Sequence, residues 1–277
     1  MQTGTGARRI VVTGASSGIG RAIAERLAAA GHVVVGTVRG SDRARAMSEA
    51  ARQAGSSLTF LPLDLSSAAE VEAAAGRVVE GGDIDVLVNN AGFGLFGAVE
   101  EAQADEAGRQ FTVNLLGPVL LTRLLLPALR RRRGRIIWIG SLAGRQALAF
   151  QGHYSASKAA IAAISDSLRM ELRPLGVQVA CVEPGDIATG FTDARVAVKS
   201  ALPVYAARAA RSRAAAEREE RNGPAPEAVA RAVERLVVRR RLPTRVPVGR
   251  LGRTTSVFLR IVPHAVAQFA VRRRYET

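Results

Sequence analysis

Tyr154 and Lys158, four residues apart, are the first pair in this sequence whose types and spacing could do chemistry. They fall in a stretch with helical spacing, where residues i and i+4 share one face. Free tyrosine has a pKa of about 10, too high for good proton exchange at neutral pH, and a nearby ammonium lowers it. The alternative is an amphipathic helix with a surface Tyr and Lys. Lys158 is one of only two lysines among 39 basic residues, and Arg would be expected at a merely solvated position, so we favour a proton-transfer pair.

A glycine-rich turn follows the first apolar run of the chain. Gly14, Gly18 and Gly20 have the spacing G-x-x-x-G-x-G, which differs from the common G-x-G-x-x-G fingerprint. Glycines in such a turn let backbone N–H groups approach a pyrophosphate at the start of a helix. A plain tight turn is the alternative. The position after the first strand of an alternating chain favours a dinucleotide site.

Ser141 comes just after the strand that we expect at 135–139. The carboxyl ends of the strands are where open α/β sheets bind their ligands, so a hydroxyl there could orient a substrate. A serine in an ordinary Gly-Ser turn is the alternative.

Strand and helix patterns alternate along the chain. We expect strands at 10–13, 33–38, 58–63, 85–88, 135–139, 178–183 and 244–248. We expect helices at 18–30, 42–54, 68–79, 104–133, 154–172 and 227–240. Such alternation implies parallel strands joined by right-handed crossovers. The sequence therefore predicts an α/β fold: a doubly wound, Rossmann-type parallel sheet of about seven strands with helices on both faces, in a single domain spanning 1–277.

Two segments fall outside this alternation. Residues 190–223 are Ala- and Arg-rich and poorly patterned, which suits a substrate flap. Residues 249–277 form a basic, apolar C-terminal extension that Pro263 should break into two short helical pieces. We expect its apolar residues to pack on the domain, on a partner subunit or over the site. Peripheral contact with an anionic membrane is the less favoured alternative.

Composition excludes several classes of protein. The net charge is +15, but no RNA-binding motif or zinc-finger spacing supports nucleic-acid binding. The three histidines are scattered and predict no metal site. Cys181 is the only cysteine, the N-terminus is short and polar, and no apolar run reaches about 18 residues. We therefore expect a cytoplasmic protein.

Three motifs together resemble the short-chain dehydrogenase/reductase superfamily over roughly residues 8–190. They are TGASSGIG at 13–20, NNAG at 89–92 and YSASK at 154–158. The resemblance implies a seven-stranded parallel sheet, a nicotinamide cofactor and assembly as a homodimer or homotetramer.

The resemblance also implies roles for individual residues. Ser141 would bind the substrate carbonyl, Tyr154 would protonate it, and Lys158 would lower the tyrosine pKa and bind the ribose. Asn114 would relay protons through water, although alone it would suggest only a kink or a surface residue. The cofactor would contact Gly14, Ser16, Ser17, Gly18, Ile19, Gly20, Arg39, Asp64, Asn90, Gly92, Tyr154, Lys158, Pro184, Gly185, Ile187 and Thr189.

The end of the second expected strand indicates which nicotinamide binds. NAD enzymes of this architecture place an acidic residue there, on the ribose 2′-hydroxyl. Val38 stands at that position, and Arg39, whose guanidinium could bind a 2′-phosphate, follows it. A solvated loop arginine is the alternative. We predict NADP(H).

The sequence thus predicts an NADP(H)-dependent oxidoreductase acting on a carbonyl or secondary alcohol. Apolar residues in the flap, with Phe191 and Tyr205, and Phe93, Leu95 and Phe96 suggest a steroid-, retinoid- or lipid-like substrate. A biosynthetic ketoreductase or an epimerase could use the same site. A non-catalytic nucleotide-sensing or scaffold protein is the rival of another class, and the complete Ser, Tyr, Lys and Asn set argues against it.

Overall fold

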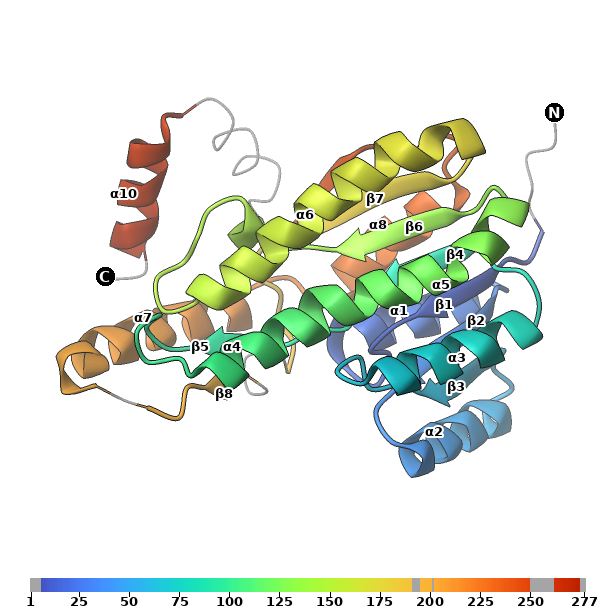
Figure 1. Cartoon of the computed structure of the whole chain (residues 1–277), viewed down its shortest axis with the longest axis horizontal. Coiled ribbons are helices and arrows are strands. Elements are labelled where there is room, and N and C mark those ends of the chain that lie inside the picture. Colours follow the sequence, from blue (N-terminus) through green and yellow to red (C-terminus); the bar gives the residue numbers. More distant parts are fainter. Residues whose placement is uncertain (1–5, 191–194, 201, 250–261, 275–277) are drawn as a thin grey trace.

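The computed structural model describes residues 6–190, 195–200, 202–249 and 262–274. Its centre is a seven-stranded sheet, entirely parallel, in the order β3-β2-β1-β4-β6-β7-β9 (Figure 1). The strands are β1 (Arg9–Val12), β2 (Val33–Val38), β3 (Leu58–Pro62), β4 (Val86–Asn89), β6 (Arg135–Ile139), β7 (Gln178–Pro184) and β9 (Arg245–Val248). The strand order runs outward from β1 in one direction and from β4 in the other. The crevice outside the carboxyl ends of β1 and β4 is therefore the switch point of a doubly wound fold.

Helices cover both faces of this sheet. They are α1 (Gly18–Ala29), α2 (Ser41–Gln53), α3 (Ala68–Glu80), α5 (Gly117–Arg131), α6 (Gly152–Leu172) and α8 (Glu227–Val238). Successive strand residues point to opposite faces. Val12 and Val34 therefore meet α1, α2 and α8 in one core layer, whereas Val11 and Val35 meet α3, α5 and α6 in the other.

The predicted fold class is confirmed, and the strand boundaries agree with the prediction to within about one residue at either end. A parallel strand is buried on both faces, so its sequence is a continuous run of apolar residues such as Val and Ile. These runs predicted the positions of the strands.

The expected helix at 104–133 is three elements. α4 (Ala104–Phe111) passes through a π-helical turn, η1 (Thr112–Leu116), into α5. The stretch Ala104–Arg131 is long and apolar enough, by length and composition, to cross a membrane. Here it is a core helix, because Leu121, Leu125 and Leu129 are buried against the sheet.

The described part of the segment expected to be a poorly patterned flap contains regular structure. After β8 (Val196–Ala197), which pairs with β5 (Leu95–Phe96), it forms the long helix α7 (Pro203–Arg221). Only Ser212, Ala215 and Ala216 of α7 are buried. Small buried residues give almost no apolar stripe, which is why the sequence pattern did not reveal the helix.

Part of the C-terminal extension packs on the rest of the protein. A helix, α10 (His264–Arg274), begins directly after Pro263, as expected of the second piece, while the first piece falls outside the described residues. Ala267 is buried, and Val271 packs with Leu148 against the buried alanines of α7. Val266 and Phe269 lie on the outer face and are exposed.

Candidate active site

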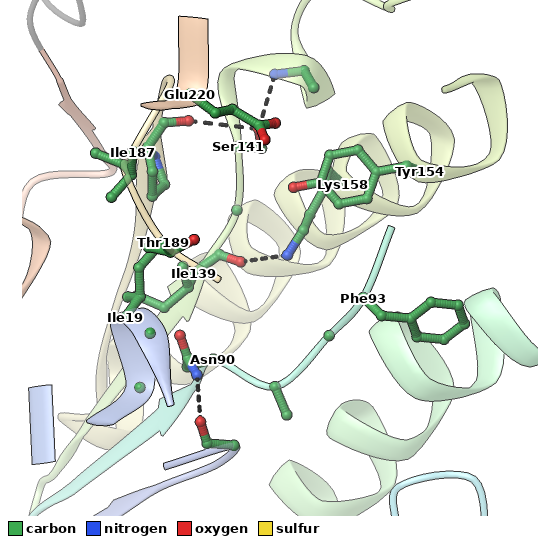
Figure 2. A pocket seen from close by; sticks show the side chains of 18 of the residues that line it. Ile19, Asn90, Phe93, Ile139, Ser141, Tyr154, Lys158, Ile187, Thr189 and Glu220 are labelled. Atoms are coloured by element: carbon green, nitrogen blue, oxygen red, sulfur yellow. Dashed lines mark hydrogen bonds between the residues drawn. The ribbon is translucent and has the colours of Figure 1, made fainter. Parts of the chain in front are cut away.

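A cavity of about 860 Å³ opens at the carboxyl ends of the strands. The glycine-rich turn, the ends of β2, β4, β6 and β7, and helix α6 line it, and Figure 2 shows how these residues converge. Another part of the wall, which we call the substrate end, comes from Gln146, Leu148, Gln151, Val196 and residues of α7 and α10.

The glycine-rich turn is tied to the end of β4. The Thr13 hydroxyl accepts hydrogen bonds from the backbone N–H groups of Asn90 (2.9 Å) and Ala91 (3.0 Å). The Asn90 Nδ2 donates to the carbonyl oxygens of Thr13 (2.9 Å) and Gly14 (3.2 Å). A Cβ at Gly20 would stand 2.2 Å from the Gly14 oxygen and 2.3 Å from the Asn90 Nδ2. Only glycine fits there.

The start of α1 has the properties of an anion site. Gly14 and Gly18 take φ of 67° and 55°, which turns the chain so that Gly18 begins the helix. The Ser17 side chain makes no capping bond, and the first turn has no acidic residue. Backbone N–H groups and the positive end of the helix dipole therefore face the cavity, which fits a pyrophosphate.

Arg39 and Asp64 follow the ends of the paired strands β2 and β3, and Arg109 of α4 lines the same cavity. Arg39 is exposed and lines the cavity, while Val38 before it is 2% exposed. Burial would raise the pKa of Asp64, but hydrogen bonds from Ser66 and the charges of Arg39 and Arg109 hold that pKa below its usual value. Arg109, on α4, was not foreseen from the sequence.

Tyr154 and Lys158 lie one turn apart on α6 and both line the cavity. The Lys158 Nζ lies 5.8 Å from the centre of the Tyr154 ring and donates to the Ile139 carbonyl oxygen at 2.9 Å (Figure 2). Ser141 lies across from them at the end of β6. Its Oγ accepts a bond from the backbone N–H of Ala143 (3.1 Å), makes a long one, 3.5 Å, to the Pro184 oxygen, and shares a hydrogen bond with the Tyr154 side chain. The long bond to Pro184 can be exchanged for one to another acceptor at little cost.

Burial dominates the proton affinities of this pair. It raises the pKa of Tyr154 to about 12, against the opposing effect of a hydrogen bond with Ser141, and the charge of Glu220 raises that pKa further. Burial also lowers the pKa of Lys158 to about 8. The sequence had led us to expect a lowered tyrosine pKa. The direction differs because the ammonium is bonded to Ile139, and desolvation disfavours the phenolate.

Asn114 sits in the π-helical turn η1, behind the cavity and not on its wall. Its side-chain oxygen accepts from the Phe93 N–H at 3.0 Å, and its Nδ2 donates to the Phe93 oxygen at 2.9 Å and the Ser157 Oγ at 3.1 Å. A Cβ at Gly92 would stand 3.0 Å from the Asn114 oxygen and 3.8 Å from the Lys158 Nζ. Gly92 thus keeps space open between the amide and the ammonium, and the proton relay stays a prediction.

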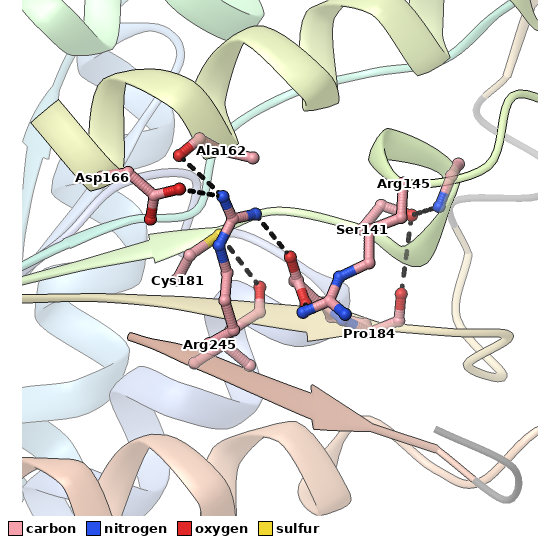
Figure 3. A network of polar contacts seen from close by, with 10 residues as sticks. Ser141, Arg145, Ala162, Asp166, Cys181, Pro184 and Arg245 are labelled. Atoms are coloured by element: carbon pink, nitrogen blue, oxygen red, sulfur yellow. Dashed lines mark hydrogen bonds and ion pairs between the residues drawn. The ribbon is translucent and has the colours of Figure 1, made fainter. Parts of the chain in front are cut away.

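A network of buried charges lies behind Ser141 (Figure 3). Glu183 of β7, whose side chain is 1% exposed, pairs with Arg145 at 2.5 Å and with Arg245 at 2.8 Å. Arg245 also bonds to Asp166 and to the Ala162 oxygen, both on α6. These contacts join the turn after Ser141 to the helix that carries Tyr154. Nothing in the sequence pattern indicated this network.

The cavity brings together all the residues predicted for the cofactor and three of the four predicted for catalysis, Asn114 being the exception. Of the apolar residues thought to meet substrate, Phe93 lines the cavity, but Leu95 and Phe96 are buried outside it, and Tyr205 packs near Phe96. Phe191 lies outside the described residues. Lining residues that the sequence did not suggest include Arg109, Gln146, Leu148, Gln151, Glu219, Glu220, Ala267, Ala270 and Val271.

Known proteins are similar to this chain in sequence and in fold. The family described as short chain dehydrogenase matches residues 8–199. A 3-ketodihydrosphingosine reductase of Bacteroides thetaiotaomicron is 36% identical over 268 residues, which cover 95% of this chain and 96% of that protein. The structure of a short-chain dehydrogenase from Streptomyces avermitilis superposes with a TM-score of 0.80 at 33% identity, covering 98% of this chain and 96% of that one. A short-chain dehydrogenase/reductase from Burkholderia phymatum in complex with NAD gives 0.76 at 28% identity, covering 89% and 90%.

The fit of the glycine turn can be tested by adding one methyl group. Gly20→Ala should weaken binding of a nicotinamide dinucleotide, NADH or NADPH, at least about tenfold, because the new Cβ displaces the Gly14 carbonyl and the Asn90 amide. Gly76→Ala is the matched control, since a Cβ at this position on α3 meets nothing within 4 Å. Fluorescence titration with both dinucleotides and thermal melting check both variants. Equal dinucleotide affinities in the two variants would contradict the role of the turn.

Proposed function

The chain belongs to the short-chain dehydrogenase/reductase family of oxidoreductases, and we propose that it is an NADP(H)-dependent reductase of a lipid-like ketone, able to run the reverse alcohol oxidation. The observation that carries the proposal is the meeting of Ser141, Tyr154 and Lys158 with the glycine-rich turn in one cavity. A bound nicotinamide would supply or accept a hydride at the carbonyl carbon.

The chain's own residues would handle the substrate oxygen and its proton. Ser141 donates its hydroxyl hydrogen to the carbonyl oxygen and holds the carbonyl beside Tyr154. The Tyr154 phenol then gives its proton to that oxygen as the carbon accepts the hydride, which leaves an alcohol and a tyrosinate. Lys158, with its positive charge nearby, stabilises the tyrosinate until a proton returns. The high pKa of Tyr154 keeps the phenol protonated at neutral pH, which is the state that reduction requires.

The substrate end supports an apolar substrate. Its wall includes Leu148, Val196, Ala267, Ala270 and Val271. A reductase of a keto-sphingoid lipid is similar over nearly the whole chain. We therefore propose long-chain, lipid-like ketones as the substrate class. We also propose that the enzyme is a homo-oligomer and is cytoplasmic.

The proposal of NADP(H) depends on the chain's own residues. A similar structure holds NAD, so similarity alone does not decide between the two cofactors. No acidic side chain stands at Val38, where one would bind the 2′-hydroxyl. Arg39 lines the cavity near Asp64, and Arg109 lies close enough to act on the same carboxylate. Two guanidinium groups at this corner favour a 2′-phosphate.

The decisive assay follows NADPH oxidation with a panel of long-chain ketones, steroids and retinal. Tyr154→Phe should lower kcat by about 10²–10⁴-fold while NADPH affinity stays unchanged, because only the transferable proton is lost. Tyr205→Phe is the control, since the Tyr205 hydroxyl bonds to Glu100 on the exposed surface. A Tyr154→Phe enzyme that kept more than about a tenth of the activity would show that Tyr154 is not the acid.

The two directions should depend oppositely on pH. Reduction needs the protonated phenol, so its kcat should stay level up to about pH 8, where Lys158 loses its proton, and decline above it. Alcohol oxidation needs the tyrosinate, whose population rises with pH towards the tyrosine pKa of about 12. Its rate should therefore climb through the neutral and alkaline range. Steady-state profiles in both directions check this, and an oxidation rate that falls with rising pH would contradict it.

Arg39→Ala tests the cofactor preference. The variant should bind NADPH about ten- to a hundredfold more weakly and NADH almost unchanged, because one charge-assisted bond to the 2′-phosphate is lost. Arg43→Ala, an exposed arginine on α2 that does not line the cavity, is the control. If Arg39→Ala weakens both cofactors equally, its role is structural.

A further inference from the structure

An ion pair borders the substrate end of the cavity, and only its acidic half reaches the wall. Glu220, near the end of α7, pairs with Arg195. The Arg195 side chain is 2% exposed and lies over the Phe96 ring, 5.8 Å from its centre. Glu220 is 16% exposed and lines the cavity, whereas Arg195 does not. The carboxylate thus faces the cavity, with the guanidinium buried behind it.

Acidic side chains line this end of the cavity. Among the described lining residues, the acidic ones are Asp64, Asp186, Glu219 and Glu220, and the basic ones are Arg39, Arg109 and Lys158. Glu219 and Glu220 belong to the substrate end, whereas the three basic residues belong to the cofactor side. Figure 2 shows Glu220 in the same corner as Ser141, above Tyr154 and Lys158. The charge of Glu220 acts on Tyr154 itself and raises its pKa, and the charge of Arg195 offsets this in part by lowering the same pKa. The carboxylate therefore lies close to the position of the reacting carbonyl.

For a neutral ketone this placement works against the reaction. Negative charge develops on the carbonyl oxygen and then on Tyr154, and a neighbouring carboxylate opposes both. A cation on the substrate reverses the effect, because it neutralises Glu220 and stabilises the developing charge. One carboxylate can accept hydrogen bonds from Arg195 and from a second cation together, since its two oxygens offer about four acceptor sites.

We infer that Glu220 binds an ammonium group carried next to the substrate carbonyl, so that the preferred substrates are long-chain 2-amino ketones. The inference rests on the carbonyl-reductase function proposed above and narrows its substrate class. The rest of the wall agrees with such a molecule. Gln146 and Gln151, 6% and 3% exposed, border the polar part, and Leu148, Ala270 and Val271 border the apolar part.

The experiment compares two ketones that differ only in the amino group. The probes are 3-ketodihydrosphingosine, which carries an ammonium beside its ketone, and its deaminated analogue, both in detergent with NADPH. The wild-type enzyme should favour the amino ketone in kcat/KM by about ten- to a hundredfold, the range expected for a charge-assisted bond. In Glu220→Gln the ratio should fall to about one, with turnover of the deaminated ketone kept or raised.

Glu217→Gln is the matched control, because Glu217 lies on the same helix, pairs with Arg213 at 2.8 Å and does not line the cavity. It should leave the preference unchanged. Glu219→Gln separates the two acidic lining residues, and loss of the preference in that variant alone would overturn the assignment to Glu220. Equal losses on both ketones in Glu220→Gln would mean that Glu220 only supports the fold, and would also overturn it.

A measurement on the wild-type enzyme covers the case in which Glu220→Gln fails to fold. The preference for the amino ketone should disappear as pH rises through the pKa of the substrate ammonium, while reduction of the deaminated ketone shows no such step. Equal reduction of the two ketones at every pH would overturn the inference and leave the proposed function standing. Reduction of neither ketone, nor of any other in the panel, would overturn the proposed function itself.

Discussion

The close approach of β1, α1 and β4 at the glycine-rich turn is the constraint on which the rest of the site depends. The Thr13 hydroxyl and the Asn90 amide hold the turn to β4 through four hydrogen bonds, and Gly20 leaves no room for a side chain between them. The start of α1 is thereby fixed at the switch point of the sheet. From this point the parallel strands, each in register with its neighbour, carry Arg39, Ser141 and the 184–189 loop to the same edge.

Opposing electrostatic effects set the chemistry at that edge. Desolvation favours the neutral phenol of Tyr154 and weakens the proton affinity of Lys158, so the pair begins with the proton on the acid that reduction requires. Behind Ser141, Glu183 is buried between Arg145 and Arg245. Removing one partner of such a pair costs about 3–5 kcal/mol, because the remaining charge stays buried. The network therefore fixes the turn of Ser141 against the helix of Tyr154 more firmly than backbone bonds alone would.

The sequence predicted those parts of the molecule whose pattern is local. The Val-rich run Val33–Val38 predicts a buried strand, and the four-residue spacing of Tyr154 and Lys158 predicts that they share one helix face. The structure has both features. The residues it missed come together only through tertiary structure. Glu220 lies 66 positions after Tyr154 on a helix with hardly any apolar stripe, and Arg245 reaches Glu183 across two paired strands. The π-helical turn that carries Asn114 likewise leaves no mark in the spacing of apolar residues. The pKa of Tyr154 depends on burial, which a motif does not encode.

The wall made by α7 and α10 has an evolutionary consequence. Ser141 and Tyr154, the residues proposed to orient the carbonyl and protonate it, sit at the end of the sheet and on α6. The substrate end is closed by two peripheral helices whose described buried side chains are few and small: Ser212, Ala215, Ala216 and Ala267. Such helices tolerate replacement, insertion or loss without disturbing the core. A lineage with this architecture can therefore exchange one substrate for another by drift in its last third, while the reaction itself is inherited unchanged.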